Sequence, residues 1–181
     1  NTMKILLAAV AAVLLSTGVM AETRPFNLSL TPDIAVYDSN ATIKGVTLSI
    51  WGENQQTSLA LGIANGSTGN SAGLSWGLVL NYADDYRGIQ WAPINYTQND
   101  FLGWQGGFVN YTAGTMKGLQ TGMVNYAGKV TGLQLGFVNF TEDANAGVQL
   151  GLVNIIRANS HWFTQLPEEL APAMIFINWR F

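Results

Sequence analysis

Gly118-Leu-Gln-Thr-Gly-Met-Val-Asn-Tyr126 is the clearest copy of a motif that the chain repeats, and this repeat indicates the architecture. The pattern Gly-x-Gln-x-Gly-x-Val-Asn recurs at residues 103–111, 132–140 and 147–155, with looser copies at 73–82 and 88–96. The marker asparagines Asn95, Asn110, Asn125, Asn139 and Asn154 are spaced 15, 15, 14 and 15 residues apart. A period of this length holds one extended segment and one turn.

Within each copy the residues alternate with the period of two that a β-strand requires. Small and amide side chains occupy one face, as in Gly132, Gln134, Gly136 and Val138. The other face is apolar and is predicted to contact membrane lipid; its selected members are Leu119, Met123, Leu133, Leu135, Phe137, Leu150 and Leu152.

Composition supports a membrane-embedded sheet. Only 10% of the residues are charged and 48% are hydrophobic, whereas soluble domains carry about a quarter charged residues. The charges gather in turns and terminal loops, as expected if one side of the sheet lies in hydrocarbon, where a Lys or Arg costs roughly 2–4 kcal/mol.

The repeat therefore predicts an all-β protein, a ten-stranded antiparallel transmembrane β-barrel built from 14–15-residue units. Three long connectors, at residues 31–43, 66–72 and 156–172, all follow odd-numbered strands and would lie on the external side. Ile177, Trp179 and the terminal Phe181 alternate along the last strand. They resemble the signature by which the barrel-assembly machinery recognises outer-membrane barrels.

A parallel β-solenoid is the alternative, because near-identical units suit stacking in register, with ladders of identical side chains. Two features strain the barrel. Pro93 lies inside a strand copy, where proline cannot donate to the ladder. Strict alternation also places the repeated aromatics, such as Tyr111 and Tyr126, on the glycine face rather than in an interfacial girdle.

The N-terminus reads as a secretory signal peptide. Lys4 precedes an apolar run from Ile5 to Leu15, and Val19-Met20-Ala21 resembles a cleavage site. We therefore expect a signal segment at 1–21, a single β-barrel domain at 22–181, and an outer-membrane location in a Gram-negative bacterium. Seven Lys and Arg against eleven Asp and Glu in the mature chain argue against a nucleic-acid partner.

The amide row Gln90, Gln105, Gln120, Gln134 and Gln149 is the most informative candidate site. It predicts either an uncharged lumen that passes a small solute or, more simply, amides that satisfy one another inside a narrow, plugged barrel. Outer-membrane lipid and lipopolysaccharide are the expected partners of what we expect to be a monomer.

Catalytic and metal chemistry find little support. His161, the only histidine, adjoins Ser160, with Glu168 and Glu169 nearby, but neighbouring residues on an extended chain point apart. We therefore expect no enzyme and no cofactor. The acidic pairs at 84–85, 142–143 and 168–169 lack the further oxygen ligands that a cation site needs, and cysteine is absent.

The repeats and the ending Leu170-Ala-Pro-Ala-Met-Ile-Phe-Ile-Asn-Trp-Arg-Phe181 resemble a family of small, mostly uncharacterised exported proteins of Vibrio-like and related proteobacteria. A looser likeness extends to Gly-Leu-Gln/Val-Asn surface-repeat proteins of spirochaetes. The resemblance implies an envelope or surface location and brings no functional residues. The role, whether structural, adhesive or solute-passing, stays open; the solenoid alternative predicts a secreted or surface-attached binding scaffold.

Overall fold

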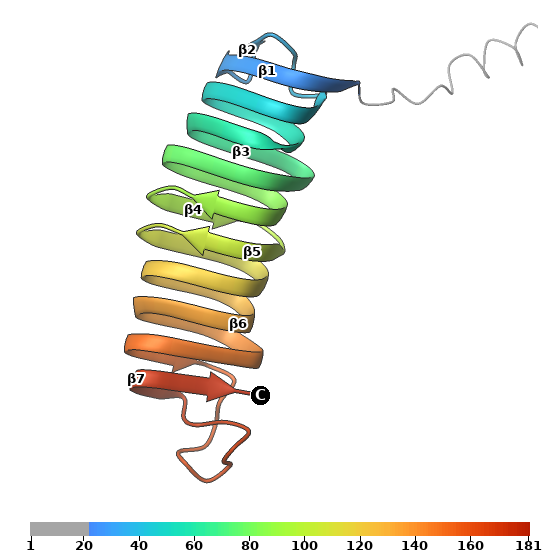
Figure 1. Ribbon diagram of the computed structural model, residues 1–181. Coiled ribbons are helices and arrows are strands. Elements are labelled where there is room, and N and C mark those ends of the chain that lie inside the picture. Colours follow the sequence, from blue (N-terminus) through green and yellow to red (C-terminus); the bar gives the residue numbers. More distant parts are fainter. Residues whose placement is uncertain (1–21) are drawn as a thin grey trace, which may run out of the picture.

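A computed structural model describes residues 22–181. The predicted signal peptide lies outside these residues. The described chain winds as a tall stack of flattened coils, with the N-terminal coil at one end and the C-terminal strand at the other (Figure 1).

Almost the whole chain is extended. The strands are β1 (Thr23–Thr31), β2 (Ile34–Ala35), β3 (Thr42–Trp91), β4 (Ile94–Thr97), β5 (Phe101–Gly106), β6 (Val109–Ile156) and β7 (Ala173–Arg180). β3 and β6 are each about 50 residues long because they continue around several coils without interruption.

Successive coils run parallel and in register. β5 pairs with β3 on one side and with β6 on the other, so that Gln90, Gln105 and Gln120 are direct neighbours. β4 joins the same two strands through Asn81, Asn95 and Asn110. Each repeat therefore lies directly on its predecessor at the usual strand spacing of about 4.8 Å.

The predicted antiparallel barrel is wrong, and the fold is the parallel β-solenoid. Within residues 22–181, antiparallel pairing joins β1 to β2 and β6 to β7 and adds one bridge between Glu169 and Arg180, all at the two ends of the stack. The physical reason lies in the repeat itself: translation along one axis places identical side chains together, whereas strands of alternating direction would separate them. The barrel and its transmembrane strands are thereby overturned, while the repeat and the β structure are confirmed.

An asparagine ladder runs through the interior. The Nδ2 atom of each asparagine donates to the Oδ1 atom of the next one along the chain, as in Asn110 to Asn125 at 2.8 Å. The ladder comprises Asn65, Asn81, Asn95, Asn110, Asn125, Asn139 and Asn154. Each is almost completely buried, so the amides exchange water for one another.

A glutamine ladder runs beside it with the opposite polarity. Each Nε2 donates to the Oε1 of the preceding glutamine, at 2.7–3.0 Å from Gln149 back to Gln90. The ladder leaves one amide group unsatisfied at each end, the Nε2 of Gln90 and the Oε1 of Gln149. The predicted polar row is therefore a closed core, fully buried, and these residues line no lumen.

An apolar row completes the interior. Tyr86, Phe101, Met116 and Val130 stack with similar spacing, and the rings of Tyr86 and Phe101 are nearly parallel with centroids 6.0 Å apart. Burial raises the pKa of the Tyr86 hydroxyl. The interior therefore combines one apolar row with two polar ladders.

Corners of the coil explain two features of the sequence. Pro93 falls between β3 and β4, where the strand is interrupted, and its carbonyl accepts hydrogen bonds from Phe108 and Val109. Glycine is required at the next copy of this corner, because a Cβ atom at Gly107 would collide with the carbonyl oxygen of Ala92. The connector predicted at 66–72 is instead part of β3, whereas 31–43 and 156–172 do cover the ends of the stack.

Candidate functional site

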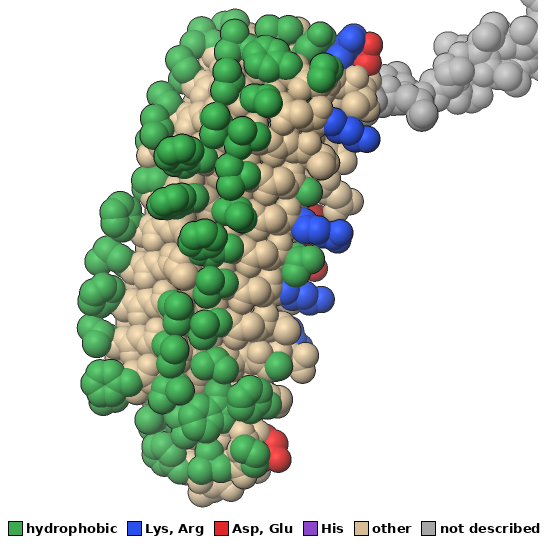
Figure 2. Space-filling view, viewed as in Figure 1, with side chains coloured by type: hydrophobic (Ala, Val, Ile, Leu, Met, Phe, Trp, Pro, Cys, Tyr) green, Lys and Arg blue, Asp and Glu red, His purple; other side chains and the backbone are tan. Residues whose placement is uncertain are grey.

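The solenoid has an unusual distribution of polarity. Amides fill its interior, while many large apolar side chains lie on the outside, as the space-filling view shows (Figure 2). Exposed apolar patches of this continuity mark interaction surfaces in soluble proteins. We divide the exterior into four sides, each defined by its residues.

The leucine–tryptophan face is the broad side toward the viewer in Figure 2. Trp76, Trp91 and Trp104 stack along it, with ring centroids 6.2 and 6.3 Å apart. Its other members include Leu48, Leu59, Leu61, Leu74, Ile89, Leu119, Leu133, Leu135, Val148 and Leu150, all partly or largely exposed.

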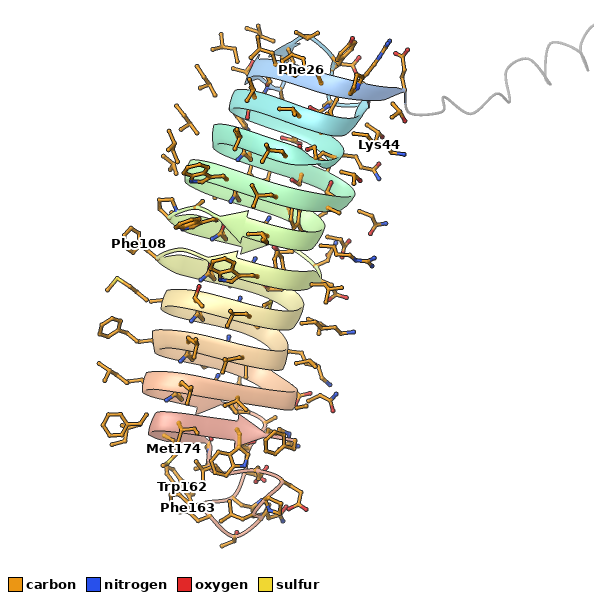
Figure 3. All side chains as sticks on the ribbon, viewed as in Figure 1. Phe26, Lys44, Phe108, Trp162, Phe163 and Met174 are labelled. Carbon is orange, nitrogen blue, oxygen red and sulfur yellow. The ribbon has the colours of Figure 1, made fainter. Side chains whose placement is uncertain are left out.

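The apolar edge is the narrow side where the chain turns from one face to the other. Its tips are Leu78, Phe108, Met123, Phe137 and Leu152, each between 49% and 66% exposed. Phe108 projects away from the stack on the side opposite Lys44 (Figure 3). Valines follow several tips, at 109, 124, 138 and 153, and remain partly exposed as well.

Two hollows lie on this edge, each with a floor of glycine. One of about 350 Å³ is lined by Leu61, Gly62, Ile63, Trp76 and Leu78, together with Ser49. The other, of about 360 Å³, is lined by Gly122, Gly136, Phe137, Gly151, Leu152 and Phe176. The lining of both hollows is mostly apolar.

Phe176 extends the apolar edge into β7 at a conformational cost. Its φ is 66°, in the left-handed region that costs a residue with a Cβ atom roughly 1–2 kcal/mol. The strained backbone leaves the phenyl ring 66% exposed next to Phe137 and Leu152. Burial of the ring in the protein's own core therefore does not account for the strain.

The tyrosine face lies on the other side of the coil. Tyr96, Tyr111, Tyr126 and Phe140 stack with centroids 4.5–5.5 Å apart and rings within 9° of parallel. Before them, the hydroxyl of Tyr82 donates to Glu53 at 2.7 Å and accepts from the Trp51 indole at 2.9 Å. Burial, with a further contribution from Glu53, raises the pKa of Tyr82.

The charged edge carries nearly all charges of the stacked coils (Figure 2). They are Lys44, Asp84, Asp85, Arg87, Asp100, Lys117, Lys129, Glu142, Asp143 and Arg157. Glu53 lies instead on the tyrosine face, where it accepts a hydrogen bond from Tyr82. Carboxylates on this edge form hydrogen bonds between successive coils. Asp85 accepts a hydrogen bond from the backbone N–H of Asp100 at 3.1 Å, and Asp100 accepts one from the backbone N–H of Thr115 at 2.7 Å.

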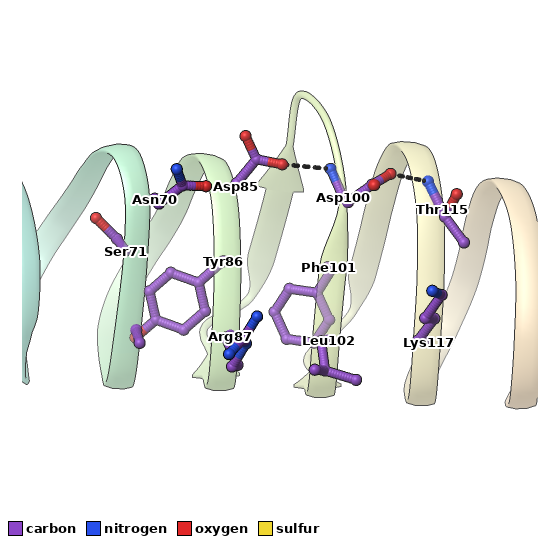
Figure 4. A pocket seen from close by; sticks show the side chains of 11 residues that line it. Asn70, Ser71, Asp85, Tyr86, Arg87, Asp100, Phe101, Leu102, Thr115 and Lys117 are labelled. Atoms are coloured by element: carbon purple, nitrogen blue, oxygen red, sulfur yellow. Dashed lines mark hydrogen bonds between the residues drawn. The ribbon is translucent and has the colours of Figure 1, made fainter.

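A shallow groove of about 560 Å³ crosses the charged edge beside these carboxylates (Figure 4). Arg87 and Lys117 flank it, and the buried rings of Tyr86 and Phe101 form its floor. Asp85 and Asp100 already accept backbone hydrogen bonds, so their position is explained by holding the coils in register.

The C-terminal cap, residues 157–172 together with β7, contains the Ser–His pair. Nδ1 of His161 lies 2.9 Å from both Ser160 Oγ and Glu169 Oε1. A catalytic triad uses the two different ring nitrogens for the nucleophile and the acid, so this is not triad geometry. Glu169 also contacts Arg180, its Oε2 lying 2.5 Å from Nη1.

Glu169 makes most of the polar contacts that hold this cap together. Burial opposes ionisation of its carboxyl group, but hydrogen bonds from His161 and from the N–H groups of Ser160 and His161, together with the charge of Arg180, outweigh burial. The pKa of Glu169 is therefore below its usual value. The arrangement holds the end of the chain against the last coil.

The sequence-predicted lipid-facing residues all point outward but divide between two sides. Leu119, Leu133, Leu135 and Leu150 lie on the leucine–tryptophan face, and Met123, Phe137 and Leu152 on the apolar edge. Ile177, Trp179 and Phe181 belong to the C-terminal cap, where the Trp179 indole donates to Pro167 at 2.9 Å.

Sequence reasoning missed Phe108, Leu78 and Phe176. The repeated Gly-x-Val triplet, as in Gly107-Phe108-Val109, was the signal that could have identified the edge. Two adjacent apolar residues after a glycine interrupt the alternation and mark a corner where both point outward.

Among residues 22–181 no group of three or more His, Asp or Glu side chains could hold a metal ion. The same part of the chain contains no helix long and apolar enough to cross a membrane. Comparison with protein-family models, curated proteins and solved structures finds no match to this chain.

Proposed function

We propose that this protein is a secreted or surface-attached β-solenoid that serves as a binding scaffold, with its apolar edge and the two adjoining faces as the binding surface. The observation that carries the proposal is the reversed polarity of the coil. Amides are buried, while Phe108, Phe137 and Leu152 are each more than half exposed. Full burial of such a side chain contributes roughly 1.5–3 kcal/mol, and these residues forgo about half of that contribution because about half of each remains in water.

A binding role fits the remaining features better than a catalytic one. Ser160 and Glu169 share one ring nitrogen of His161, and the groove on the charged edge has its carboxylates engaged in backbone hydrogen bonds. The predicted signal peptide and the resemblance to exported repeat proteins support a location at or beyond the cell envelope.

Binding of an apolar fluorescent dye to the folded chain tests the proposal. The dye should bind below the unfolding transition and brighten, because exposed apolar surface is available in the native state. Phe137→Asp combined with Leu152→Asp should weaken the signal, because it places two charges within the apolar edge. Asn70→Asp combined with Gln98→Glu, which adds the same charge at the charged edge, should leave the signal unchanged. Absence of dye binding to the native chain would contradict the proposal.

A further inference from the structure

We infer that the apolar edge inserts edge-on into the acyl-chain region of a phospholipid surface, while the charged edge stays in water. The inference rests on the proposed function, because it names the partner of the same binding surface. It concerns a solenoid lying in a lipid surface and involves no membrane-spanning strand.

The arrangement of charge is the first observation. Lys44 lies opposite Phe108 (Figure 3), and from Thr42 to Ile156 the other charged side chains except Glu53 share the charged edge with it. Apolar rows cover the apolar edge and both flanking faces. A hydrocarbon phase covers three sides of an object at once, whereas a second copy related by twofold symmetry covers one. The distribution is therefore complementary to a lipid surface with water on its far side.

Backbone pairing is the second observation. Hydrocarbon excludes unpaired N–H and C=O groups. Interior coils meet this demand, since β5 is paired with β3 on one side and with β6 on the other. The tips of the edge are paired too: the N–H of Phe108 donates to Pro93, and that of Met123 donates to Phe108. The edge can therefore enter lipid without breaking hydrogen bonds.

Phe176 and the cap supply the third observation. Phe176 holds its ring outward, on the line of the apolar edge, at φ 66°. Trp162 and Phe163 extend from the cap with about half of their surface exposed, and tryptophan is favoured at membrane–water interfaces (Figure 3). A lipid surface would give these exposed rings an apolar environment.

The charge balance predicts how binding responds to salt. Residues 22–181 carry seven Lys and Arg against eleven Asp and Glu, and the two signs are mixed along the charged edge. Attraction to anionic headgroups is therefore not the driving force. Insertion should occur on zwitterionic phosphatidylcholine and persist at high salt, because burial of apolar surface is not screened.

Co-flotation of the full chain with phosphatidylcholine vesicles is the test. The chain should float with vesicles at low and high salt. Phe137→Asp combined with Leu152→Asp should lower the partition coefficient about 100-fold or more, since each change removes an apolar group from the lipid. The matched pair Asn70→Asp and Gln98→Glu should float like the parent chain.

A second measurement needs no variant. Vesicles with brominated acyl chains should quench the tryptophan fluorescence of the parent chain, because Trp76, Trp91 and Trp104 flank the apolar edge. Failure to float, release by high salt, or equal flotation of the edge variant would overturn the inference. Dye binding without flotation would support the proposed binding function and would reject only lipid as the partner. Sedimentation equilibrium would then show whether a second copy covers the edge.

Discussion

The coils before Asn81 and the coils after Gly88 share one parallel stack but fill it differently. In the earlier coils the asparagine ladder begins at Asn65, but most other buried polar positions hold short side chains such as Ser58 and Ser75, whose hydrogen bonds follow no repeat. In the later coils each position repeats the same amide, and the two ladders run without a break from Gln90 to Asn154. Parallel stacking therefore tolerates varied interiors, and the ladders add stability to it.

Breaking the asparagine ladder should give the largest effect. Asn125→Asp replaces a buried amide, which donates to Asn139 and to the Leu135 carbonyl, by a carboxylate that cannot donate. We expect a loss of about 3–5 kcal/mol in the free energy of unfolding at neutral pH, because a buried charge is left unpaired. Urea denaturation measures it, with the exposed Asn70→Asp as control. A cost equal to the control's would show that the ladder contributes nothing.

Interrupting the glutamine ladder should cost less. Gln120→Met removes the acceptor of Gln134 Nε2, while Gln105 Oε1 still accepts from Thr112. The expected loss is about 1–3 kcal/mol. In the earlier coils, Ser75→Ala removes a single hydrogen bond to Asn81 and should cost roughly 1 kcal/mol. If urea denaturation gives the same loss in the free energy of unfolding for both substitutions, a continuous ladder stabilises the chain no more than a single hydrogen bond does.

The C-terminal cap should open in acid before the stack does. The pKa of Glu169 is lower folded than unfolded, so its stabilisation is complete above the unfolded value, roughly 4.3, and is lost as pH falls through the folded value. Hydrogen exchange of residues 157–181 should accelerate in that acid range. Glu169→Gln should abolish the pH-dependent step, and an identical step in this variant would contradict the assignment.

Extending the glutamine ladder toward the earlier coils should give the smallest change in the stability of the chain. Gly88 stacks on Gly73, so Ser75 occupies the row before Gln90, whose Nε2 lacks an acceptor. Ser75→Gln should supply the missing Oε1 and stabilise the chain by about 1 kcal/mol, less the hydrogen bond that Ser75 makes to Asn81. Thermal unfolding measures the gain; a clear loss would show that the earlier coil has no room for the longer amide side chain.

Much of the local structure could be predicted from the sequence. The alternation within each unit and the interruption at Pro93 follow from the residues. The turns predicted between units are mostly wrong, because β3 and β6 continue through them, and only residues 98–100 separate two strands, β4 and β5. Strand direction could not be predicted in the same way, because a period of 14–15 residues fits one barrel strand or one complete coil. Both architectures place the leucines of the repeat on the outside, so these leucines were interpreted as the lipid-facing side of a barrel.

One pattern in the sequence did favour the solenoid. Gln120 and Asn125 are five residues apart, so strict alternation would place them on opposite faces, yet both are completely buried. A corner at Gly122, Met123 and Val124 brings both side chains inward, and it also places the repeated tyrosines outside. The identity of the binding partner has no comparable signal, since apolar rows suit lipid or protein equally until the position of the charges in space is known.

The fold and the binding surface both depend on neighbouring coils running in the same direction, and spin labels at Leu119→Cys and Leu133→Cys report that direction. The chain has no cysteine of its own, so labelling is confined to these sites. Gly132 stacks on Gly118, which makes Leu119 and Leu133 neighbours. A parallel solenoid predicts strong dipolar coupling across a backbone separation of about 5 Å. Weak coupling across roughly 20 Å, as in an antiparallel hairpin joined near Lys129, would contradict it.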